Sequence, residues 1–259
     1  MKVLKNAVEA KHLSIGWGDL IVLNKINLKL CEGEKLAIVG PSGSGKSTIL
    51  KILAGLILPT EGELKIFGEK QDYLRLDQTN PPDVRLVFQN PALLGSLTIE
   101  ENVGFLLNKD KSLSKKIIHD IVSECLEEVG LINVGNKFPN ELSGGMQKRV
   151  SFARALITDR NLDKKNRPLL LFDEPTAGLD PIASSRIEDL INKTNKKANG
   201  SSIVVSHVLS TIERTSDKVL MLYGGKFRWA GSIDEFKKSK DPYVFQFRNG
   251  KLDGPMQPK

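Results

Sequence analysis

Residues 40–47 carry the pattern on this chain that could do chemistry most directly. They read GPSGSGKS, fit G-x-x-x-x-G-K-[ST], and follow the apolar run 36–39. A glycine-rich turn between a strand and a helix aims backbone N–H groups and the positive helix end at one point, where phosphates can bind. The pattern predicts a nucleoside triphosphate site, with Lys46 on the β and γ phosphates and Ser47 on Mg²⁺. The predicted nucleotide-contacting residues of this segment are Gly40, Ser42, Gly43, Ser44, Gly45, Lys46, Ser47 and Thr48.

A second pattern supplies the carboxylates that hydrolysis of a bound triphosphate needs. Residues 169–172 are all apolar, as in a strand buried on both faces of a parallel sheet, and Asp173 and Glu174 follow at its carboxyl end. Asp173 is then placed to hold the Mg²⁺ shell, and Glu174 to orient or deprotonate the attacking water. Paired carboxylates after an apolar strand are common, so this interpretation depends on the phosphate loop.

The chain also resembles the ATP-binding cassette (ABC) ATPases, in motifs that follow the family's order. The further motifs are VFQ at 87–89, LSGGMQ at 142–147, AGLD at 177–180 and His207 after IVVS at 203–206. The resemblance covers nearly the whole chain. It implies ATP and Mg²⁺ as cofactors, with Gln89 as a further metal ligand and catalytic residue.

The LSGGMQ segment suggests how two copies of the chain would cooperate. Ser143 precedes a predicted helix, so its hydroxyl and the N–H groups of Gly144 and Gly145 form an anion site at a helix N-terminus. In the family this site faces the γ-phosphate held by the other subunit. The resemblance therefore implies a head-to-tail homodimer with ATP sandwiched between the subunits, Asp180 in the shared nucleotide site and His207 as the γ-phosphate sensor.

The two tryptophans are interpreted differently. Trp17 stands where the family has an aromatic residue that stacks on adenine, a contact worth roughly 1 to 3 kcal/mol by analogy with base stacking. The alternative is an exposed turn aromatic. Trp229 lies in a strand after a glycine turn and is predicted to pack.

Composition excludes several other classes of protein. The net charge of +7 comes from scattered short lysine pairs without interleaved aromatic residues, so we expect no nucleic-acid binding. No apolar run approaches the roughly 18 to 20 residues of a membrane span, and the charged N-terminus is unlike a secretory signal. Two cysteines favour a reduced compartment. We therefore expect a cytoplasmic protein, peripheral on the inner face of the plasma (inner) membrane, whose membrane pathway belongs to a separate permease.

The predicted fold class is α/β: a P-loop NTPase core with a mostly parallel sheet, an antiparallel β-subdomain and a helical subdomain. Residues 25–30 alternate between polar and apolar, as in a strand with one solvated face. Apolar residues at 117–129 recur at steps of three and four, as on an amphipathic helix closed by Gly130. We expect an ABC nucleotide-binding domain at 1–240, with a helical subdomain at about 91–157, and a C-terminal extension at 241–259.

Two segments depart from the bare family pattern. Residues 158–167 form a long polar stretch, predicted as a solvated loop extension. Residues 241–255 resemble the tail of ATPases from Mla-type lipid transporters, and 93–105 and 178–184 look particularly like the cyanobacterial and chloroplast branch. In the tail Tyr243, Phe245 and Phe247 alternate, so an extended conformation would present one aromatic face.

The resulting hypothesis is an ATP-hydrolysing subunit that energises membrane phospholipid transport. The resemblance to the lipid branch implies a multispanning permease and a lipid-binding protein of the mammalian-cell-entry type in the same complex. An ATPase of a polar-solute importer shares every motif before residue 240 and remains the alternative. A soluble ABC ATPase of DNA repair or translation is disfavoured, because the sequence has neither a coiled-coil arm nor a second cassette.

Overall fold

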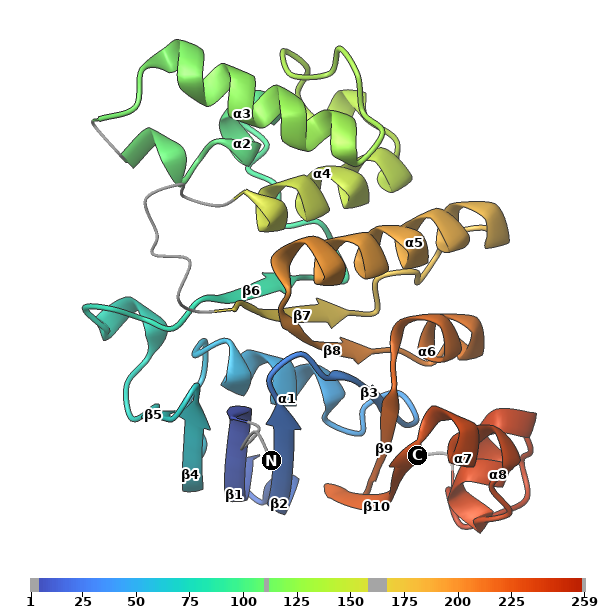
Figure 1. The fold of residues 1–259 in the computed structure, drawn as a ribbon. Coiled ribbons are helices and arrows are strands. Elements are labelled where there is room, and N and C mark those ends of the chain that lie inside the picture. Colours follow the sequence, from blue (N-terminus) through green and yellow to red (C-terminus); the bar gives the residue numbers. More distant parts are fainter. Residues whose placement is uncertain (1–4, 110–111, 158–166, 258–259) are drawn as a thin grey trace. The chain divides into compact units, whose positions relative to one another are not determined.

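A computed structural model of the chain describes residues 5–109, 112–157 and 167–257. They form two compact units, whose elements are drawn in Figure 1. Unit 1 takes in 1–86, 167–174 and 195–259, and unit 2 takes in 87–166 and 175–194. The polar stretch at 158–167 falls, apart from Arg167, outside the described residues.

The central sheet of unit 1 has the strand order β10-β9-β3-β8-β7-β6. Four adjacent strands, β9, β3, β8 and β7, run parallel to one another. Strand β10 pairs antiparallel with β9. Every residue of β7 and of β8 is buried, which explains why all of them except Asp173 are apolar or small. The strands are β3 (Lys35–Val39), β6 (Val84–Val87), β7 (Leu169–Asp173), β8 (Ser201–Val205), β9 (Lys218–Tyr223) and β10 (Lys226–Ser232).

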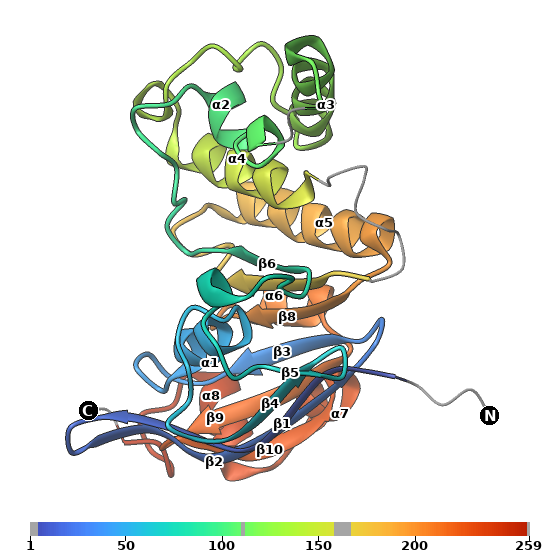
Figure 2. The same ribbon diagram turned by 90° about the vertical axis from the view of Figure 1, so that its left-hand side faces the viewer.

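A second, antiparallel sheet lies in the same unit, with the order β2-β1-β4-β5. In β2 every second residue from Ile26 to Leu30 is buried, which is the alternation that the sequence predicted. Figure 2 shows β1, β2 and β4 side by side. The strands are β1 (Asn6–Trp17), β2 (Leu20–Cys31), β4 (Glu61–Ile66) and β5 (Glu69–Lys70).

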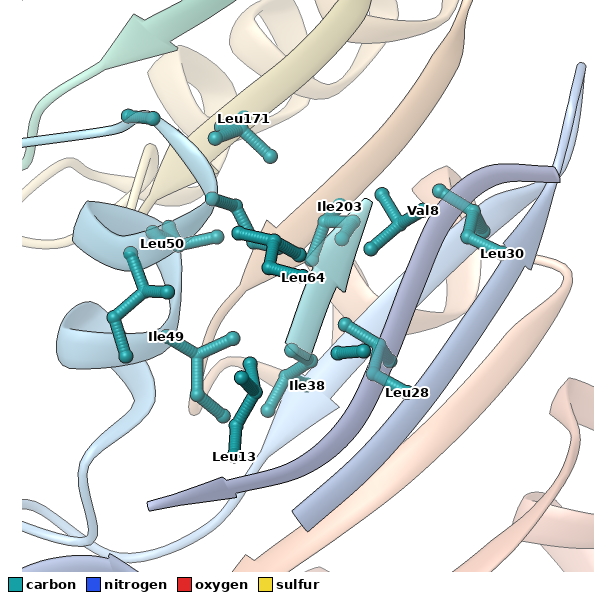
Figure 3. Close-up of a cluster of buried hydrophobic side chains, with 14 of the residues drawn as sticks. Val8, Leu13, Leu28, Leu30, Ile38, Ile49, Leu50, Leu64, Leu171 and Ile203 are labelled. Carbon is teal, nitrogen blue, oxygen red and sulfur yellow. The ribbon is translucent and has the colours of Figure 1, made fainter. Parts of the chain in front are cut away.

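The main core of unit 1 fills the space between this antiparallel sheet, α1 (Lys46–Leu53) and the central strands. Figure 3 shows Leu13 and Leu28 from the antiparallel sheet converging with Ile49 of α1 and Ile38 of β3, and all four are almost fully buried. Each such side chain contributes roughly 1.5 to 3 kcal/mol by leaving water. The helix and the strand that flank the predicted phosphate loop are therefore both anchored in one core.

Strand β3 faces two cores because successive side chains point to opposite sides of a sheet. Leu36 and Ile38 belong to the core just described, whereas Ala37 and Val39 belong to a second cluster. This cluster includes Met221 of β9 and side chains of three short helices. The helices are α6 (Leu209–Thr215), α7 (Ile233–Lys238) and α8 (Pro242–Asn249).

The C-terminal tail is helical, so the predicted extended aromatic face is wrong. Asp241 caps α8 by accepting from the amides of Tyr243 (3.0 Å) and Val244 (3.2 Å), and Pro242 occupies the first turn. Val244 is fully buried in the second cluster, whereas Phe245 is 42% exposed. Residues 241–257 therefore complete the core of unit 1.

Unit 2 is mainly helical, and within it α2, α3 and α4 contact one another. The predicted amphipathic helix ends as expected: α3 finishes at Glu128, and Gly130 follows with a φ of +70°. The last four residues of α5, 195–198, belong to unit 1. The elements are α2 (Ile99–Val103), α3 (Lys115–Glu128), α4 (Gly144–Leu156) and α5 (Pro181–Ala198), with single 3₁₀ turns at Arg75–Asp77 in unit 1 and at Leu107–Lys109 and Pro139–Glu141 in unit 2.

The predicted fold class is confirmed, with a largely parallel sheet, an antiparallel sheet and helices. Trp229 packs as predicted, with its ring 5.8 Å from that of Phe236. Across the part of the chain that the structure describes, no helix combines the length and the apolar character needed to cross a membrane.

Candidate nucleotide-binding site

The phosphate loop runs from the end of β3 to the start of α1, as the sequence predicted. Three of its glycines have positive φ: Gly40 (+150°), Gly43 (+73°) and Gly45 (+102°). A Cβ on Gly45 would lie 3.0 Å from side-chain atoms of Val22 and Leu23, so this position also lacks room for a side chain. The loop therefore needs glycine both for its conformation and for its close approach to β2.

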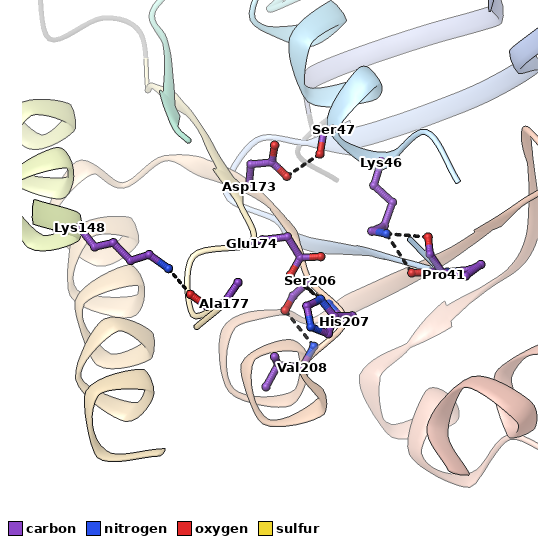
Figure 4. Close-up of polar contacts among 11 residues, drawn as sticks. Pro41, Lys46, Ser47, Lys148, Asp173, Glu174, Ala177, Ser206, His207 and Val208 are labelled. Atoms are coloured by element: carbon purple, nitrogen blue, oxygen red, sulfur yellow. Dashed lines mark hydrogen bonds and ion pairs between the residues drawn. The ribbon is translucent and has the colours of Figure 1, made fainter. Parts of the chain in front are cut away.

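Lys46 turns back over the loop. Its ammonium Nζ donates to the carbonyl oxygens of Gly40 and Pro41, each at 2.9 Å (Figure 4). Burial lowers the pKa of Lys46, while the carboxylates of Asp173 and Glu174 oppose the shift. A buried cation held by neutral carbonyls in this way is well suited to receive an anion.

Ser47 and Asp173 bring two oxygen ligands together. The Ser47 hydroxyl Oγ donates to Asp173 Oδ1 at 2.8 Å, across the contact between α1 and β7. Burial raises the pKa of Asp173 and the neighbouring Glu174 carboxylate adds to the shift, against the bond from Ser47. A hydroxyl and a carboxylate are hard oxygen donors of the kind that Mg²⁺ prefers.

Glu174 and His207 meet at the carboxyl ends of β7 and β8, which are neighbours in the sheet. His207 Nδ1 lies 2.9 Å from Glu174 Oε2, and the amide of His207 donates to the same oxygen at 3.3 Å. Glu174 has a φ of +44°, unusual for a residue with a side chain, and its amide donates to the Val205 carbonyl at 2.9 Å. The backbone thus fixes Glu174, which is nearly buried, beside an exposed imidazole.

These residues fit ATP with Mg²⁺. Ser44 Oγ is buried and has no hydrogen-bond partner among the described residues, which suits a donor for a phosphate oxygen. No cluster of three or more His, Cys, Asp or Glu that could hold a metal occurs in the described ranges. Mg²⁺ often takes only one or two protein ligands and completes its shell with phosphates and water. Ser47 and Asp173 match that requirement.

Trp17 ends β1 at the tip of the hairpin with β2, where it pairs with Leu20. Its side chain is 55% exposed and available for stacking. The same hairpin contributes Val22 and Leu23, the two side chains that approach Gly45. The hairpin that carries Trp17 therefore reaches the start of α1.

In unit 2, Ser143 is the N-cap of α4, and its Oγ accepts the amide of Met146 at 3.3 Å. Ser143 and Gly144 are exposed and Gly145 is half-buried, so the N-terminus of α4 is open to a ligand. Gln147 fixes the preceding loop by donating to the carbonyls of Pro139 (2.8 Å) and Leu142 (3.2 Å). The structure thus has an open helix N-terminus at the position where the sequence predicts an anion site.

The other predicted residues of unit 2 stand in loops. Asp180 caps α5, where its Oδ1 accepts from the amides of Ala183 and Ile182, each at 2.9 Å, and these bonds lower its pKa. Gln89 follows β6 and precedes a segment held by the buried Asn102, which bonds both the amide and the carbonyl of Leu94. Ser143, Asp180 and Gln89 therefore belong to one unit, and the phosphate-loop residues to the other.

Sequence reasoning missed the side chains that hold these loops. Arg154 of α4 donates to the carbonyl of Ala92 at 2.6 Å, and Lys148 donates to that of Ala177. No sequence signal identifies a backbone carbonyl as the partner of a particular lysine or arginine.

Known proteins are similar to this chain in family and in fold. Residues 23–177 match the family model described as ABC transporter. The chain is similar to the dimeric ATP-binding cassette MJ0796 in a post-hydrolysis state with ADP and Pi, with a TM-score of 0.74 and 32% identity over 87% of this chain and 98% of that one. It is also similar to cbiO1 of Clostridium perfringens, with a TM-score of 0.76 and 27% identity over 96% of both chains.

Three curated relatives have more specific names. The chain is 45% identical to the Arabidopsis thaliana chloroplast protein TRIGALACTOSYLDIACYLGLYCEROL 3, over 96% of this chain and 75% of that protein. It is 36% identical to MlaF of Haemophilus influenzae, the ATP-binding protein of an intermembrane phospholipid transport system, over 98% and 94%. It is 34% identical to a probable ribonucleotide transport ATP-binding protein of Mycobacterium leprae, over 96% and 71%. The chain belongs to the ABC transporter family, as an ATP-binding subunit.

Proposed function

We propose that the chain hydrolyses ATP as a homodimer and so drives phospholipid transport through a separate permease. The observation that carries the lipid assignment is similarity over nearly the whole chain, C-terminal tail included, to a phospholipid transport ATP-binding protein. The tail is part of this similarity, and its helix α8 is built into the core of unit 1. It is an integral part of the fold rather than an incidental terminus.

The residues of unit 1 divide the chemistry among them. Lys46 exchanges two neutral carbonyl partners for phosphate oxygens, and Ser47 and Asp173 hold Mg²⁺, which when bound neutralises phosphate charge. Glu174 accepts the proton of the attacking water, because its carboxylate is fixed beside His207 at the proposed phosphate site. His207 hydrogen-bonds the γ-phosphate and orients Glu174. Trp17 stacks on adenine.

The signature segment of unit 2, LSGGMQ at 142–147, acts on the nucleotide of the other subunit. Ser143 with the N–H groups of Gly144 and Gly145 offers the open helix end to a γ-phosphate, and Asp180 stands in the same shared site. Gln89 would add a ligand to the Mg²⁺ that Ser47 and Asp173 hold, and would sense the γ-phosphate. Dimerisation is then a requirement for hydrolysis, since neither half of the site is complete in one subunit.

The complex would place this subunit on the cytoplasmic, inner face of the plasma (inner) membrane, bound to a multispanning permease. A lipid-binding protein of the mammalian-cell-entry type would complete the assembly. We expect no nucleic acid among the partners, because the positive charge of the chain is not concentrated in one segment.

A second candidate function is transport of a polar solute. The name of the mycobacterial relative favours it, since that protein is described as a probable ribonucleotide transporter subunit. The catalytic residues are the same for both functions, so hydrolysis alone does not distinguish them.

Affinity purification of the full-length chain from detergent-solubilised membranes tests the assignment. We expect a permease and a lipid-binding protein to co-purify, with phospholipid extractable from the complex and ATPase activity in the eluate. Glu174→Gln purified in parallel controls for ATPase contaminants. Co-purification with a solute-binding protein and no bound lipid would favour the second candidate, and a complex without ATPase activity would contradict both.

A further inference from the structure

Residues 176–179 of unit 2 form a tight turn whose central peptide has an unusual orientation. The amide of Leu179 donates to the Thr176 carbonyl at 3.2 Å, and Gly178 has a φ of +73° whereas Ala177 has a negative φ. This combination is typical of a type II turn, in which the central carbonyl, here that of Ala177, points away from the turn. A Cβ on Gly178 would meet nothing within 4 Å, so glycine is needed for its φ and not for space.

Lys148 of α4 binds that central carbonyl. Its Nζ donates to the Ala177 oxygen, as Figure 4 shows, and the side chain is half-buried. The neighbouring Gly145 adds a second point of approach, because a Cβ there would lie 3.9 Å from Leu179 Cδ2. The first turns of α4 therefore contact the turn at 176–179.

The contact is one of three made by consecutive residues of α4 to backbone carbonyls. Gln147 holds the loop before the helix, and Arg149 donates to the Gly130 carbonyl at 2.8 Å. Lys148 alone of the three is directed to the loop that leads into α5. A cation on a carbonyl forms a stronger bond than a neutral donor, and it favours one orientation of the peptide over its flipped alternative.

We propose that Lys148 is a positioning residue that fixes the turn at 176–179 to the helix that begins at Ser143. The turn leads directly to Asp180, so Lys148 makes the α4 N-terminus and the Asp180 segment move as one body. This inference rests on the proposed function for its consequence, because both segments serve the partner's nucleotide in the assembled dimer. The fixation itself is a property of the single chain.

Hydrogen exchange of the Leu179 amide in the full-length chain without nucleotide tests the fixation. Lys148→Met should speed exchange there by about tenfold, the size expected for loss of a hydrogen bond to a charged donor. Lys148→Arg should restore slow exchange, since its guanidinium can reach the same carbonyl. Lys193→Met, an exposed lysine on α5, is the control for loss of one charge. Unchanged exchange in Lys148→Met, or an equal rise in Lys193→Met, would overturn the proposal.

Gly178→Ala gives a second route, since alanine disfavours a φ of +73°. It should speed exchange of the same amide, and the two substitutions together should have less than the product of their separate effects, because both act on one turn. Independent, multiplicative effects would count against a shared turn.

ATP-induced association of the Glu174→Gln chain measures the consequence. Adding Lys148→Met should weaken this association by about tenfold and leave ATP binding by the monomer within twofold, with Lys148→Arg restoring it. Full association in the Lys148→Met double variant would refute the positioning role in assembly. If Glu174→Gln itself bound ATP without associating, the sandwich in the proposed function would fail while the exchange result still decided the fixation.

Discussion

His207 Nδ1 and the amide of His207 both lie within hydrogen-bond distance of a single oxygen, Glu174 Oε2, at 2.9 and 3.3 Å. The carboxylate is therefore held by residue 207 through its ring and through its backbone. Replacing the imidazole removes only one of these contacts. The orientation of Glu174 thus depends partly on the course of the chain after β8, because the amide of residue 207 remains a donor when the imidazole is replaced by another side chain such as alanine.

Glu174→Gln should keep ATP binding and lose turnover. The amide can still accept both bonds from His207, yet it cannot take a proton from water, and loss of a general base typically costs about 10² to 10⁴ in rate. Steady-state ATPase assays of the complex, with a nucleotide-binding assay beside them, measure the two effects. Near-wild-type turnover would show that Glu174 is not the general base.

Lys46→Ala and Ser143→Arg should separate the two half-sites. Lys46→Ala weakens nucleotide binding by the monomer, because the loop loses its buried cation. Ser143→Arg leaves that binding intact and blocks ATP-induced dimerisation, because Ser143 serves the partner's nucleotide. Equilibrium binding reports the first effect and sizing with ATP the second. If Ser143→Arg abolished binding by the monomer, the sandwich arrangement would be wrong.

Asp173→Asn should stabilise the nucleotide-free chain at neutral pH. The folded state raises the pKa of Asp173, so the folded protein holds this proton more tightly than the unfolded chain. The stability from that proton is present at acid pH and is lost as pH rises through the folded pKa. Above that pKa the ionised carboxylate destabilises the folded state. Thermal unfolding should show a higher midpoint for Asp173→Asn at pH 7 and a smaller difference in acid. A constant difference at every pH would contradict this account.

A permease contact beside Gln89 should be detectable by cross-linking. Residues 89–94 lead from Gln89 to the segment that Asn102 holds. A cysteine at Asn90 stands next to Gln89, and a cysteine at Leu94 stands on a backbone that Asn102 fixes. We expect either to cross-link to the permease in the purified complex, after replacement of Cys31 and Cys125. A cysteine at the exposed Lys11 of β1 is the matched control. Cross-links from Lys11 alone would place the permease elsewhere.

Substitutions on the two faces of α8 should separate folding from assembly. Val244→Ala removes buried methyl groups and should destabilise the monomer by about 2 kcal/mol. Phe245→Ala, on the exposed face, should leave monomer stability nearly unchanged and weaken the dimer or the complex if the tail serves assembly. Denaturant unfolding and analytical ultracentrifugation measure the two effects. Unchanged association of Phe245→Ala, with and without permease, would confine the tail to the fold of unit 1.

The sequence predicted the sheet and the phosphate loop well because their signals are local. Strand β7 begins with an unbroken apolar run, 169–172, and the glycines of 40–45 mark a turn whose positive φ angles demand them. The meeting of Glu174 with His207 also follows once β7 and β8 are taken as neighbours, since parallel strands bring their carboxyl ends to one edge.

The tail was mispredicted because two signals competed there. Aromatic residues at 243, 245 and 247 have the period of a strand, whereas Asp241, Pro242 and Gly250 mark the start and end of a helix. The helix prevails because it buries Val244 and directs Tyr243 and Phe247 toward the same cluster. The positive φ of Glu174 and the carbonyl partner of Lys148 carry no sequence signal, since both depend on tertiary contacts.

Gln246 lies buried on α8 and holds Met256 in both directions, accepting from its amide and donating to its carbonyl, each at 2.8 Å. Residues 241–256 therefore close the cluster against β3, a strand made about two hundred residues earlier in synthesis. During synthesis this apolar surface stays uncovered until the tail leaves the ribosome. A chain truncated before residue 241 would keep this apolar surface exposed. Chaperones and proteases would then recognise the chain as incompletely folded.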